Sequence, residues 1–271
     1  MSTRIRALLA AGCFMLLTGC ASARTDAASF SEAKASSEAS FSAGNAAVQA
    51  EAASEGTLTQ ADGYSISVIT LLRTKNKNVR YLRFSGLGDE AAQKKWNDFY
   101  ADAAYAAVGK AVSGDEIDDR FQVKTADASL ISVYQENEYY FAGAAHPFTD
   151  VSTLNIDPET GVLKSLPTEC DTAALAKDIL AEQGYTITAL DGEKSEYLTL
   201  DEVKNMNGIT DEASLTALLN GFDLPADEKS GAVPDGWSYW EDGKVNLLFS
   251  VSHASGDWVV LHMDGSYRLS S

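Results

Sequence analysis

The sequence predicts an α+β domain with a largely antiparallel sheet and a few packed helices. Candidate strands and helices come in blocks along the chain rather than in strict alternation, which is typical of this class. Most candidate strands follow one another through short turns, the connection that antiparallel strands use. With 271 residues, 45% of them hydrophobic, the chain is long enough to bury the core of a single domain.

Two strands and a long helix begin the predicted domain. Residues 64–72 and 79–84 are rich in alternating β-branched and apolar side chains, which indicates strands. Asp89 is a candidate N-cap for a helix from Glu90 to Lys110. The apolar face of this helix is expected to contain Trp96, Phe99, Ala103 and Ala107.

Further elements follow to the end of the chain. Strands are expected at residues 121–124, 130–134, 139–142, 148–156, 237–240, 245–251 and 258–263. Helices are expected at residues 172–183, 199–208 and 210–220. Asp171 caps the first of these helices, and Thr199 with Glu202 forms a capping-box pattern for the second.

The first twenty residues have the pattern of a bacterial lipoprotein signal peptide. Arg4 and Arg6 precede an apolar run, residues 7–17, that is short for a permanent membrane-spanning helix. The run ends in Leu-Thr-Gly-Cys at residues 17–20, which resembles a lipobox. That resemblance implies that Cys20 is diacylated on sulfur and becomes the mature N-terminus. An ordinary signal peptide or an uncleaved anchor that contains Cys is the alternative.

This pattern divides the chain into three parts. Residues 1–19 are the predicted signal peptide, residues 20–60 the lipidated Cys20 with a disordered tether, and residues 61–271 the folded domain. The tether is predicted because residues 21–60 contain 13 Ala and 8 Ser and lack an apolar stripe. We therefore expect a protein anchored by lipid to the bacterial cell membrane, on its extracytoplasmic face.

Cleavage at Cys20 would have two consequences for the mature chain. The formal net charge would change from −18 to −20, because Arg4 and Arg6 would leave with the signal peptide. Cys170 would be the one cysteine without lipid, so no intramolecular disulfide could form. Its neighbours Glu169 and Asp171 should raise the pKa of its thiol, which predicts an inert side chain.

The charge balance excludes some classes of partner. The chain has 21 Lys and Arg against 39 Asp and Glu, so it is poorly suited to hold a nucleic-acid backbone. An acidic surface of this kind suits a basic protein partner. Three cysteines are too few for a disulfide-rich secreted scaffold.

No motif of the sequence predicts a catalytic residue, a metal site or a cofactor. The three histidines, His146, His253 and His262, have no metal-ligand spacing, although His253 and His262 flank a turn and could face each other. They are expected to be structural or surface residues. The chain also lacks the G-x-S-x-G motif of serine hydrolases.

Two further patterns resemble binding motifs. Residues 86–91 fit G-x-G-x-x-A, but the preceding strand carries Arg80 and Arg83, whereas a dinucleotide site needs a strand buried on both faces. We interpret them as a glycine turn before a capped helix. The acidic run at residues 115–119 lacks the spacing of a calcium-binding loop, and a solvated loop is expected there.

The middle of the chain resembles a known family. Residues 139–147 read Tyr-Tyr-Phe-Ala-Gly-Ala-Ala-His-Pro, and residues 154–166 read Leu-Asn-Ile-Asp-Pro-Glu-Thr-Gly-Val-Leu-Lys-Ser-Leu. These segments are similar to the DUF3298 family with its N-terminal DUF4163 partner, although Ala144 and Val162 depart from the family pattern. That extracytoplasmic unit occurs in the lysozyme-sensing anti-sigma factor RsiV and in PdaC-type peptidoglycan deacetylases. The resemblance covers most of residues 61–263.

The motif residues are expected to define the fold rather than to act in catalysis. They are Gly143, His146, Asn155, Asp157, Thr160 and Gly161. Residues 157–161 should make a tight turn with a glycine at positive φ. Pro147 keeps His146 extended, so its imidazole could hydrogen-bond across to that turn.

These observations lead to one principal functional hypothesis. The chain is expected to be a membrane-tethered envelope lipoprotein that is not an enzyme. Its domain would bind a basic protein such as lysozyme, as the resemblance implies, or a cell-wall polymer. The alternative is an accessory enzyme of cell-wall hydrolysis or deacetylation.

Overall fold

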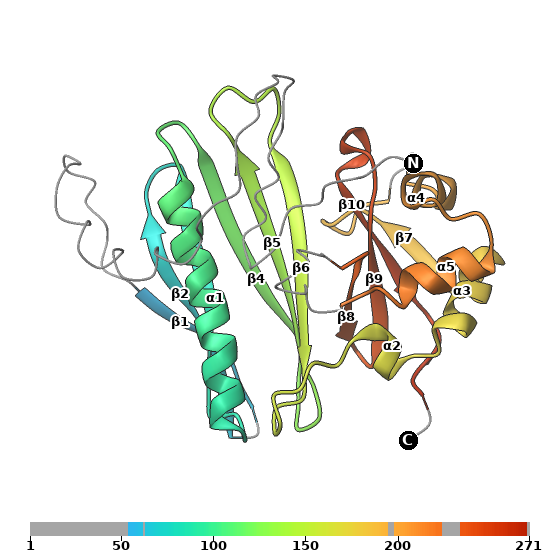
Figure 1. Cartoon of the computed structure of the whole chain (residues 1–271), viewed down its shortest axis with the longest axis horizontal. Coiled ribbons are helices and arrows are strands. Elements are labelled where there is room, and N and C mark those ends of the chain that lie inside the picture. Colours follow the sequence, from blue (N-terminus) through green and yellow to red (C-terminus); the bar gives the residue numbers. More distant parts are fainter. Residues whose placement is uncertain (1–53, 62, 195–197, 224–233, 270–271) are drawn as a thin grey trace, which may run out of the picture.

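Two β-sheets and five α-helices make up the part of the chain that this computed structural model describes (Figure 1). The described residues are 54–61, 63–194, 198–223 and 234–269. The predicted signal peptide and Cys20 lie outside them. The six-stranded sheet, here the first sheet, has the order β1-β2-β3-β4-β5-β6, and the four-stranded second sheet has the order β7-β10-β9-β8. All neighbouring strands are antiparallel except β3 and β4, so the predicted α+β class is confirmed.

The elements have the following bounds. The strands are β1 (Ser54–Ala61), β2 (Tyr64–Arg73), β3 (Lys77–Ser85), β4 (Glu116–Ala126), β5 (Ile131–Tyr140), β6 (Phe148–Ile156), β7 (Tyr185–Thr188), β8 (Trp237–Glu241), β9 (Lys244–Ser250) and β10 (Trp258–Met263). The helices are α1 (Glu90–Lys110), α2 (Leu166–Glu169), α3 (Thr172–Leu180), α4 (Leu200–Asn207), α5 (Glu212–Leu219) and the short 3₁₀ helix η1 (His253–Ser255).

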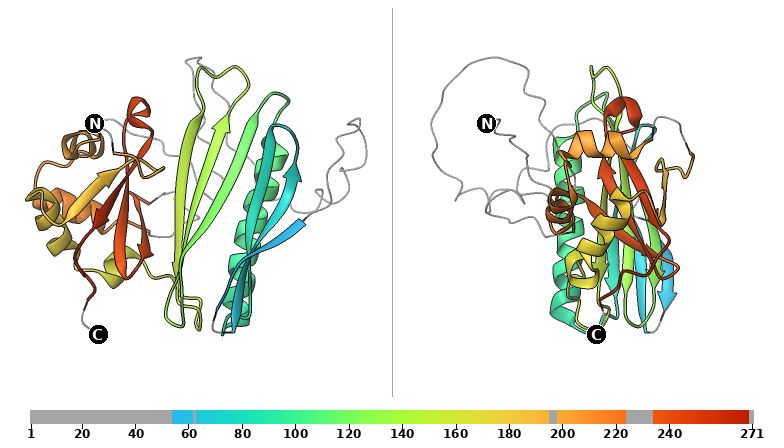
Figure 2. Two further views of the ribbon diagram at one scale, coloured as in Figure 1. Left: turned by 180° about the vertical axis from the view of Figure 1, so that it is seen from behind. Right: turned by 90° about the vertical axis from the view of Figure 1, so that its right-hand side faces the viewer.

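Helix α1 packs on one face of the first sheet, over β2 and β3 (Figure 2, left, where it lies behind those strands). Trp96 and Tyr100 are buried there against Leu82 and Phe84 of β3. The predicted apolar face is right except for Phe99, which is 39% exposed. Tyr100 takes its place because the 3.6-residue period carries the stripe from Trp96 to Tyr100.

Helices α2 to α5 lie on the far side of the second sheet from the first sheet (Figure 1). Leu175 of α3 and Leu215 of α5 share one core with Leu247 and Phe249 of β9, and all four are almost completely buried. The second sheet is therefore covered by helices on this face, as expected for a layered α+β protein.

The two sheets are joined through the edge of β8, whose outward-facing backbone groups are bound by side chains of the first sheet. Asn155 donates to the carbonyl of Ser238 at 2.8 Å, and Thr125 donates to that of Trp240 at 2.7 Å. The hydroxyl of Ser132 accepts the N–H of Trp240 at 2.8 Å. An exposed strand edge is thereby satisfied without a neighbouring strand.

A buried carboxylate completes this junction. Asp223, 4% exposed, accepts hydrogen bonds from the N–H and the hydroxyl of Ser238, from the N–H of Leu166 and from the hydroxyl of Thr153. Burial raises its pKa to about 6, although these hydrogen bonds act in the opposite direction. The side chain thus connects α2, β6 and β8.

Several sequence predictions need correction. Strand β1 includes residues 54–60, which were assigned to the tether. The run at residues 115–119 is not a solvated loop, because β4 begins at Glu116 and both Asp115 and Asp119 are buried. Residues 130–134 and 139–142 belong largely to one strand, β5, and neither α2 nor β7 was predicted.

Candidate ligand-binding groove

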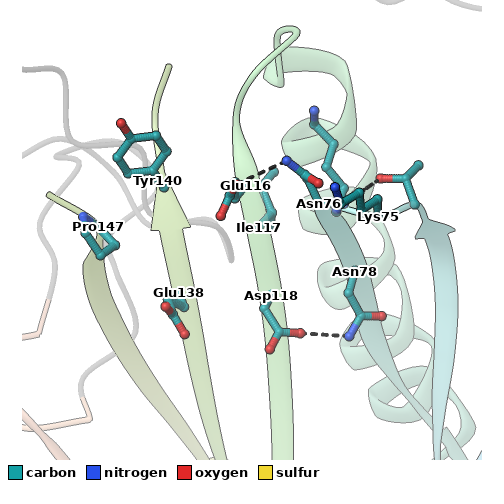
Figure 3. Close-up of a pocket in the computed structure, with 11 residues that line it drawn as sticks. Lys75, Asn76, Asn78, Glu116, Ile117, Asp118, Glu138, Tyr140 and Pro147 are labelled. Atoms are coloured by element: carbon teal, nitrogen blue, oxygen red, sulfur yellow. Dashed lines mark hydrogen bonds between the residues drawn. The ribbon is translucent and has the colours of Figure 1, made fainter. Parts of the chain in front are cut away.

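A groove of about 540 Å³ lies over the N-terminal ends of β3 and β4, where the two strands pair (Figure 3). The two strands pair only at Lys77 with Ile117 and at Asn78 with Asp118. Beyond these positions, β3 pairs with β2 and β4 pairs with β5. One residue further on, the carboxylate of Asp119 accepts the backbone N–H of Arg80 at 2.9 Å in place of a strand partner.

The groove combines two rings with a row of polar side chains. Tyr140 and Pro147 stand on the β5–β6 side, and Asn76 and Asn78 stand on the β3 side (Figure 3). The complete lining is Thr74, Lys75, Asn76, Lys77, Asn78, Glu116, Ile117, Asp118, Glu138, Tyr140 and Pro147. Such a surface offers apolar contact on one side and several hydrogen-bonding groups on the other.

The polar side chains of the groove hold one another in place. Asn78 donates to Asp118 at 2.7 Å, as Figure 3 shows. Arg120 donates from Nε to Asp118 at 2.8 Å, from Nη1 to Glu136 at 2.8 Å and from Nη2 to Glu138 at 3.0 Å. A carboxylate can accept about four hydrogen bonds, so Asp118 and Glu138 keep acceptor capacity for a ligand.

The carboxyl of Asp119 lies beneath α1, close to the groove. It is 5% exposed, and burial raises its pKa to about 7. The negative charge of Asp118 also raises the pKa, whereas the N–H and the positive charge of Arg80 lower it. A carboxyl with such a pKa often marks an acid–base site. However, the cavity that it shares with Tyr100 and Tyr139 has a volume of only about 10 Å³. That space cannot admit a substrate, so the geometry indicates a structural residue.

The six predicted motif residues are not brought together. Gly143 and His146 lie in the loop between β5 and β6, beside Pro147 of the groove. At the opposite end of that strand, Asn155 is the second-last residue of β6, and Asp157, Thr160 and Gly161 lie in the turn that follows. The motif therefore occupies two separate places in the fold.

The turn at residues 157–161 docks onto α1. Oδ1 of Asp157 accepts hydrogen bonds from the N–H and the hydroxyl of Thr160, and these contacts lower the pKa of Asp157. Gly161 has φ +64°, and a Cβ there would lie 2.3 Å from the Cβ of Ala92. Trp96 donates to the carbonyl of Gly161 at 2.9 Å. The contacts of this turn are those of a structural element.

The histidines divide into a pair and a single residue. The ring centroids of His146 and His253 are 5.7 Å apart. His262 contacts Asn246 at 2.7 Å and Thr188 at 2.9 Å. The structure therefore places His253 against His146 and not against His262, and His146 lies at the opposite end of β6 from the turn at residues 157–161.

The glycine turn at residues 86–91 has no room for a nucleotide. A Cβ on Gly86 would lie 2.4 Å from the carbonyl oxygen of Gly63, and one on Gly88 would lie 2.4 Å from that of Glu159. Asp89 caps α1, as predicted, by accepting the N–H groups of residues 91 and 92. The chain itself packs against these glycines, which confirms a turn before a capped helix.

Cys170 is a buried thiol. It is 2% exposed, and burial raises its pKa to about 12, with Glu169 adding to the effect and Arg268 opposing it. The prediction that Cys170 is an inert side chain is consistent with this burial. Among the described residues, no three His, Cys, Asp or Glu side chains are grouped as metal ligands. The helices of the described ranges include none that is long and apolar enough to cross a membrane.

Sequence reasoning missed the groove. Its acidic side chains on β4 are Glu116 and Asp118, which alternate with buried residues along the strand, and Arg120 follows them on the same face of the sheet. The same alternation is present in the sequence, where residues 115–119 were interpreted as a loop. The contribution of β3 leaves no such signal, because β3 and β4 are separated by the whole of α1.

This chain is similar to solved structures at low sequence identity. No family model and no curated protein matches the sequence. A crystal structure described as a DUF3298 family protein from Pseudomonas aeruginosa is 14% identical, with a TM-score of 0.38, over 79% of this chain and 88% of that one. A member of the same family from Bacteroides fragilis is 10% identical, with a TM-score of 0.42, over 80% of this chain and 91% of that one.

Proposed function

We propose that this protein is a lipid-anchored envelope lipoprotein whose domain binds a cell-wall component in the β3–β4 groove without transforming it. The observation that supports this function best is the groove itself. Its volume of about 540 Å³ lies in the range of pockets that hold small molecules or a short segment of a polymer. A concave site of that size is small for the face of a globular protein.

The lining of the groove suits a short glycan or a stem peptide. Tyr140 and Pro147 present rings on which the apolar face of a sugar or side chain can lie. Asp118 and Glu138 accept hydrogen bonds, as required for hydroxyl, amide and ammonium donors. The exposed Lys75 at the rim can pair with a carboxylate of the wall polymer.

The hydrogen bonds among the side chains of the groove favour ligand binding over catalysis. Asp118 is fixed by Asn78 and Arg120, Glu138 by Arg120, and Glu116 by Asn76 at 3.1 Å. These contacts present each carboxylate as a fixed acceptor. Fixed acceptors lower the ordering cost of binding a ligand.

A basic protein such as lysozyme is a second candidate ligand, and the observation that favours it is the charge. A formal net charge of −18 attracts a cationic protein and speeds its association. Binding of this kind weakens as salt screens the charges. The salt dependence therefore separates this candidate from a ligand held in the groove.

The test is titration of the full chain with soluble peptidoglycan fragments, followed by calorimetry. Tyr140→Ala and Glu138→Gln should each raise the Kd about tenfold, equivalent to about 1.4 kcal/mol. Glu212→Gln on α5 is the matched control and should leave the Kd unchanged. Equal binding by all variants would rule out the groove. Turnover of the fragments would support the alternative of an accessory hydrolase or deacetylase, and salt-sensitive capture of lysozyme would support the second candidate.

A further inference from the structure

A pair of histidines connects the two sheets outside the groove. His146 lies in the loop between β5 and β6, and His253 lies in η1, between β9 and β10. The ring centroids are 5.7 Å apart and the ring planes are inclined by 38°. Both residues are exposed, with the side chain of His253 at 52%. The sequence gives no sign of this pair, because 107 positions separate its members.

A carboxylate orients one ring of the pair. His253 donates from Nδ1 to Oδ1 of Asp257 at 2.9 Å, and Oδ2 of Asp257 accepts the N–H of Thr149 at 2.9 Å. With Nδ1 engaged in this way, the neutral imidazole carries its lone pair on Nε2. A histidine that binds a metal ion typically has such a carboxylate on its other nitrogen.

The loop that carries His253 is fixed on its other side as well. Glu202 of α4 accepts the N–H of Ser252 at 3.3 Å and the hydroxyl of Ser255 at 3.2 Å. Asp257 has φ +68°, a conformation that non-glycine residues seldom adopt. The imidazole of His253 is therefore held in place by contacts on both flanks of η1.

The separation of the rings matches that of two imidazoles on one metal ion. With metal–nitrogen bonds of about 2.0 Å, the centroids of two ligand rings lie roughly 4.5 to 6.5 Å apart, depending on the angle at the metal. The observed 5.7 Å falls within this range. In the part of the chain that the structure describes, neither nitrogen of His146 has a hydrogen-bond partner, so one of them is available as a ligand.

We propose that His146 and His253 bind a divalent transition-metal ion of the Zn²⁺ or Cu²⁺ class, with Asp257 as the outer partner of His253. Imidazole nitrogen is a preferred ligand of these ions. Water completes the coordination, since the described residues supply no third grouped ligand. Such an ion bridges the loop of the first sheet and the loop of the second.

His262 is an internal control for this site. Asn246 and Thr188 contact its two ring nitrogens, and burial lowers its pKa, with Glu241 opposing and Lys124 adding to the effect. The chain has three histidines in total. A spectrum of histidine side chains therefore contains two reporters of the site and one residue that should not respond.

The experiment is a titration of the untagged full chain with Zn²⁺, followed by NMR of the histidine side chains and by calorimetry. The signals of His146 and His253 should shift together to saturation while that of His262 stays in place. His146→Ala or His253→Ala should weaken binding at least about tenfold, and Asp257→Asn should weaken it about 10- to 100-fold, the usual effect of an outer partner. An unchanged His262 signal in each variant reports that the fold is retained.

Two outcomes would overturn the site. One is a set of His146 and His253 signals that do not move at millimolar Zn²⁺. The other is a Zn²⁺ affinity that the variant lacking both histidines keeps in full. Paramagnetic broadening by Cu²⁺ gives an independent readout, because it should remove the signals of His146 and His253 and spare that of His262. Equal broadening of all three would count against the site.

Discussion

The side-chain amide of Asn155 donates to the carbonyl oxygen of Ser238 at 2.8 Å, across the boundary between the two sheets. The same Asn155 accepts a hydrogen bond from the hydroxyl of Ser132 at 2.7 Å, and Ser132 in turn accepts the N–H of Trp240. All three polar side-chain contacts are buried. One residue of the predicted motif therefore belongs to the network that joins the halves of the molecule.

The first prediction concerns Asn155→Ala. The carbonyl of Ser238 and the hydroxyl of Ser132 would lose a buried partner, and we expect the free energy of unfolding to fall by about 1 to 3 kcal/mol. Urea denaturation measures this change. The control is Asn76→Ala, an exposed amide of the groove, for which a change within about 0.5 kcal/mol is expected. Equal losses of unfolding free energy in Asn155→Ala and Asn76→Ala would contradict the role of Asn155 in joining the two sheets.

The second prediction concerns the pH dependence of stability that Asp119 produces. Its pKa is about 7 in the folded protein, above the ordinary value of 3.8, so the folded state binds more protons than the unfolded state between these pH values. Stability from this group is therefore fully present below about pH 4 and is lost as the pH rises to about 7. Asp223, with a pKa of about 6, contributes with the same sign over pH 4 to 6.

Asp119→Asn removes the charge and keeps an acceptor for the N–H of Arg80. We expect this variant to be more stable than the parent at pH 8 by up to about 4 kcal/mol, at 1.36 kcal/mol per pH unit, and to match it near pH 4. Asp118→Asn is the control, because it removes an exposed ion pair and should lower stability by less than about 1 kcal/mol. Chemical denaturation at pH 4 and pH 8 distinguishes the two variants. An Asp119→Asn variant that is less stable than the parent at pH 8 would refute the raised pKa of Asp119.

The third prediction separates two reasons for a glycine at residue 161. Gly161→Ala must accommodate both a positive φ and a contact of 2.3 Å with Ala92, whereas Gly192→Ala meets a positive φ in open space. The strain of a left-handed residue alone costs about 1 to 2 kcal/mol, so Gly192→Ala should lose that amount and Gly161→Ala more. Ala92→Gly should restore part of the stability in the Gly161→Ala background. Thermal unfolding of these three variants, with Ala92→Gly alone as the reference, tests this, and the absence of any rescue would exclude the contact as the cause.

The fourth prediction concerns Cys20, which lies outside the described residues. If its sulfur carries the lipid, Cys20→Ser should move the protein from the membrane fraction to the soluble fraction and abolish incorporation of labelled palmitate. The physical reason is that two acyl chains give stable anchoring, whereas no other feature of the mature chain was predicted to insert into a bilayer. Cys170→Ser is the control for the label. Incorporation of labelled palmitate that survives Cys20→Ser would exclude Cys20 as the lipidated residue.

Local signals in the sequence account for much of the fold. Asp89, Asp171 and Thr199 cap the N-termini of helices, as the sequence predicted. Gly208 ends α4 in a left-handed conformation. These features depend on hydrogen bonds within a few residues, so a short stretch of sequence contains the information. The strands with clear alternation, β2 and β6, were found for the same reason.

The remaining features depend on partners far away in the chain. Strand β1 forms because residues 54–61 pair with β2, which the alanine and serine composition upstream obscured. The groove requires the ends of β3 and β4 to lie side by side for two residues, although the whole of α1 separates the two strands along the chain. The pairing of His146 with His253 depends on how one sheet sits on the other. None of these relations has a spacing that a sequence pattern could reveal.

The edge of β8 docks on a part of the protein that is synthesised before it. Every strand of the first sheet comes from residues 54–156, which leave the ribosome or a translocation channel before residues 237–241 do. The side chains that bind the backbone of Ser238 and Trp240 are therefore synthesised before β8. A variant that lacks the strands of the first sheet would leave β8 with an open edge, able to pair with another molecule. The N-terminal part of the described chain thus supplies the surface on which the edge of β8 docks.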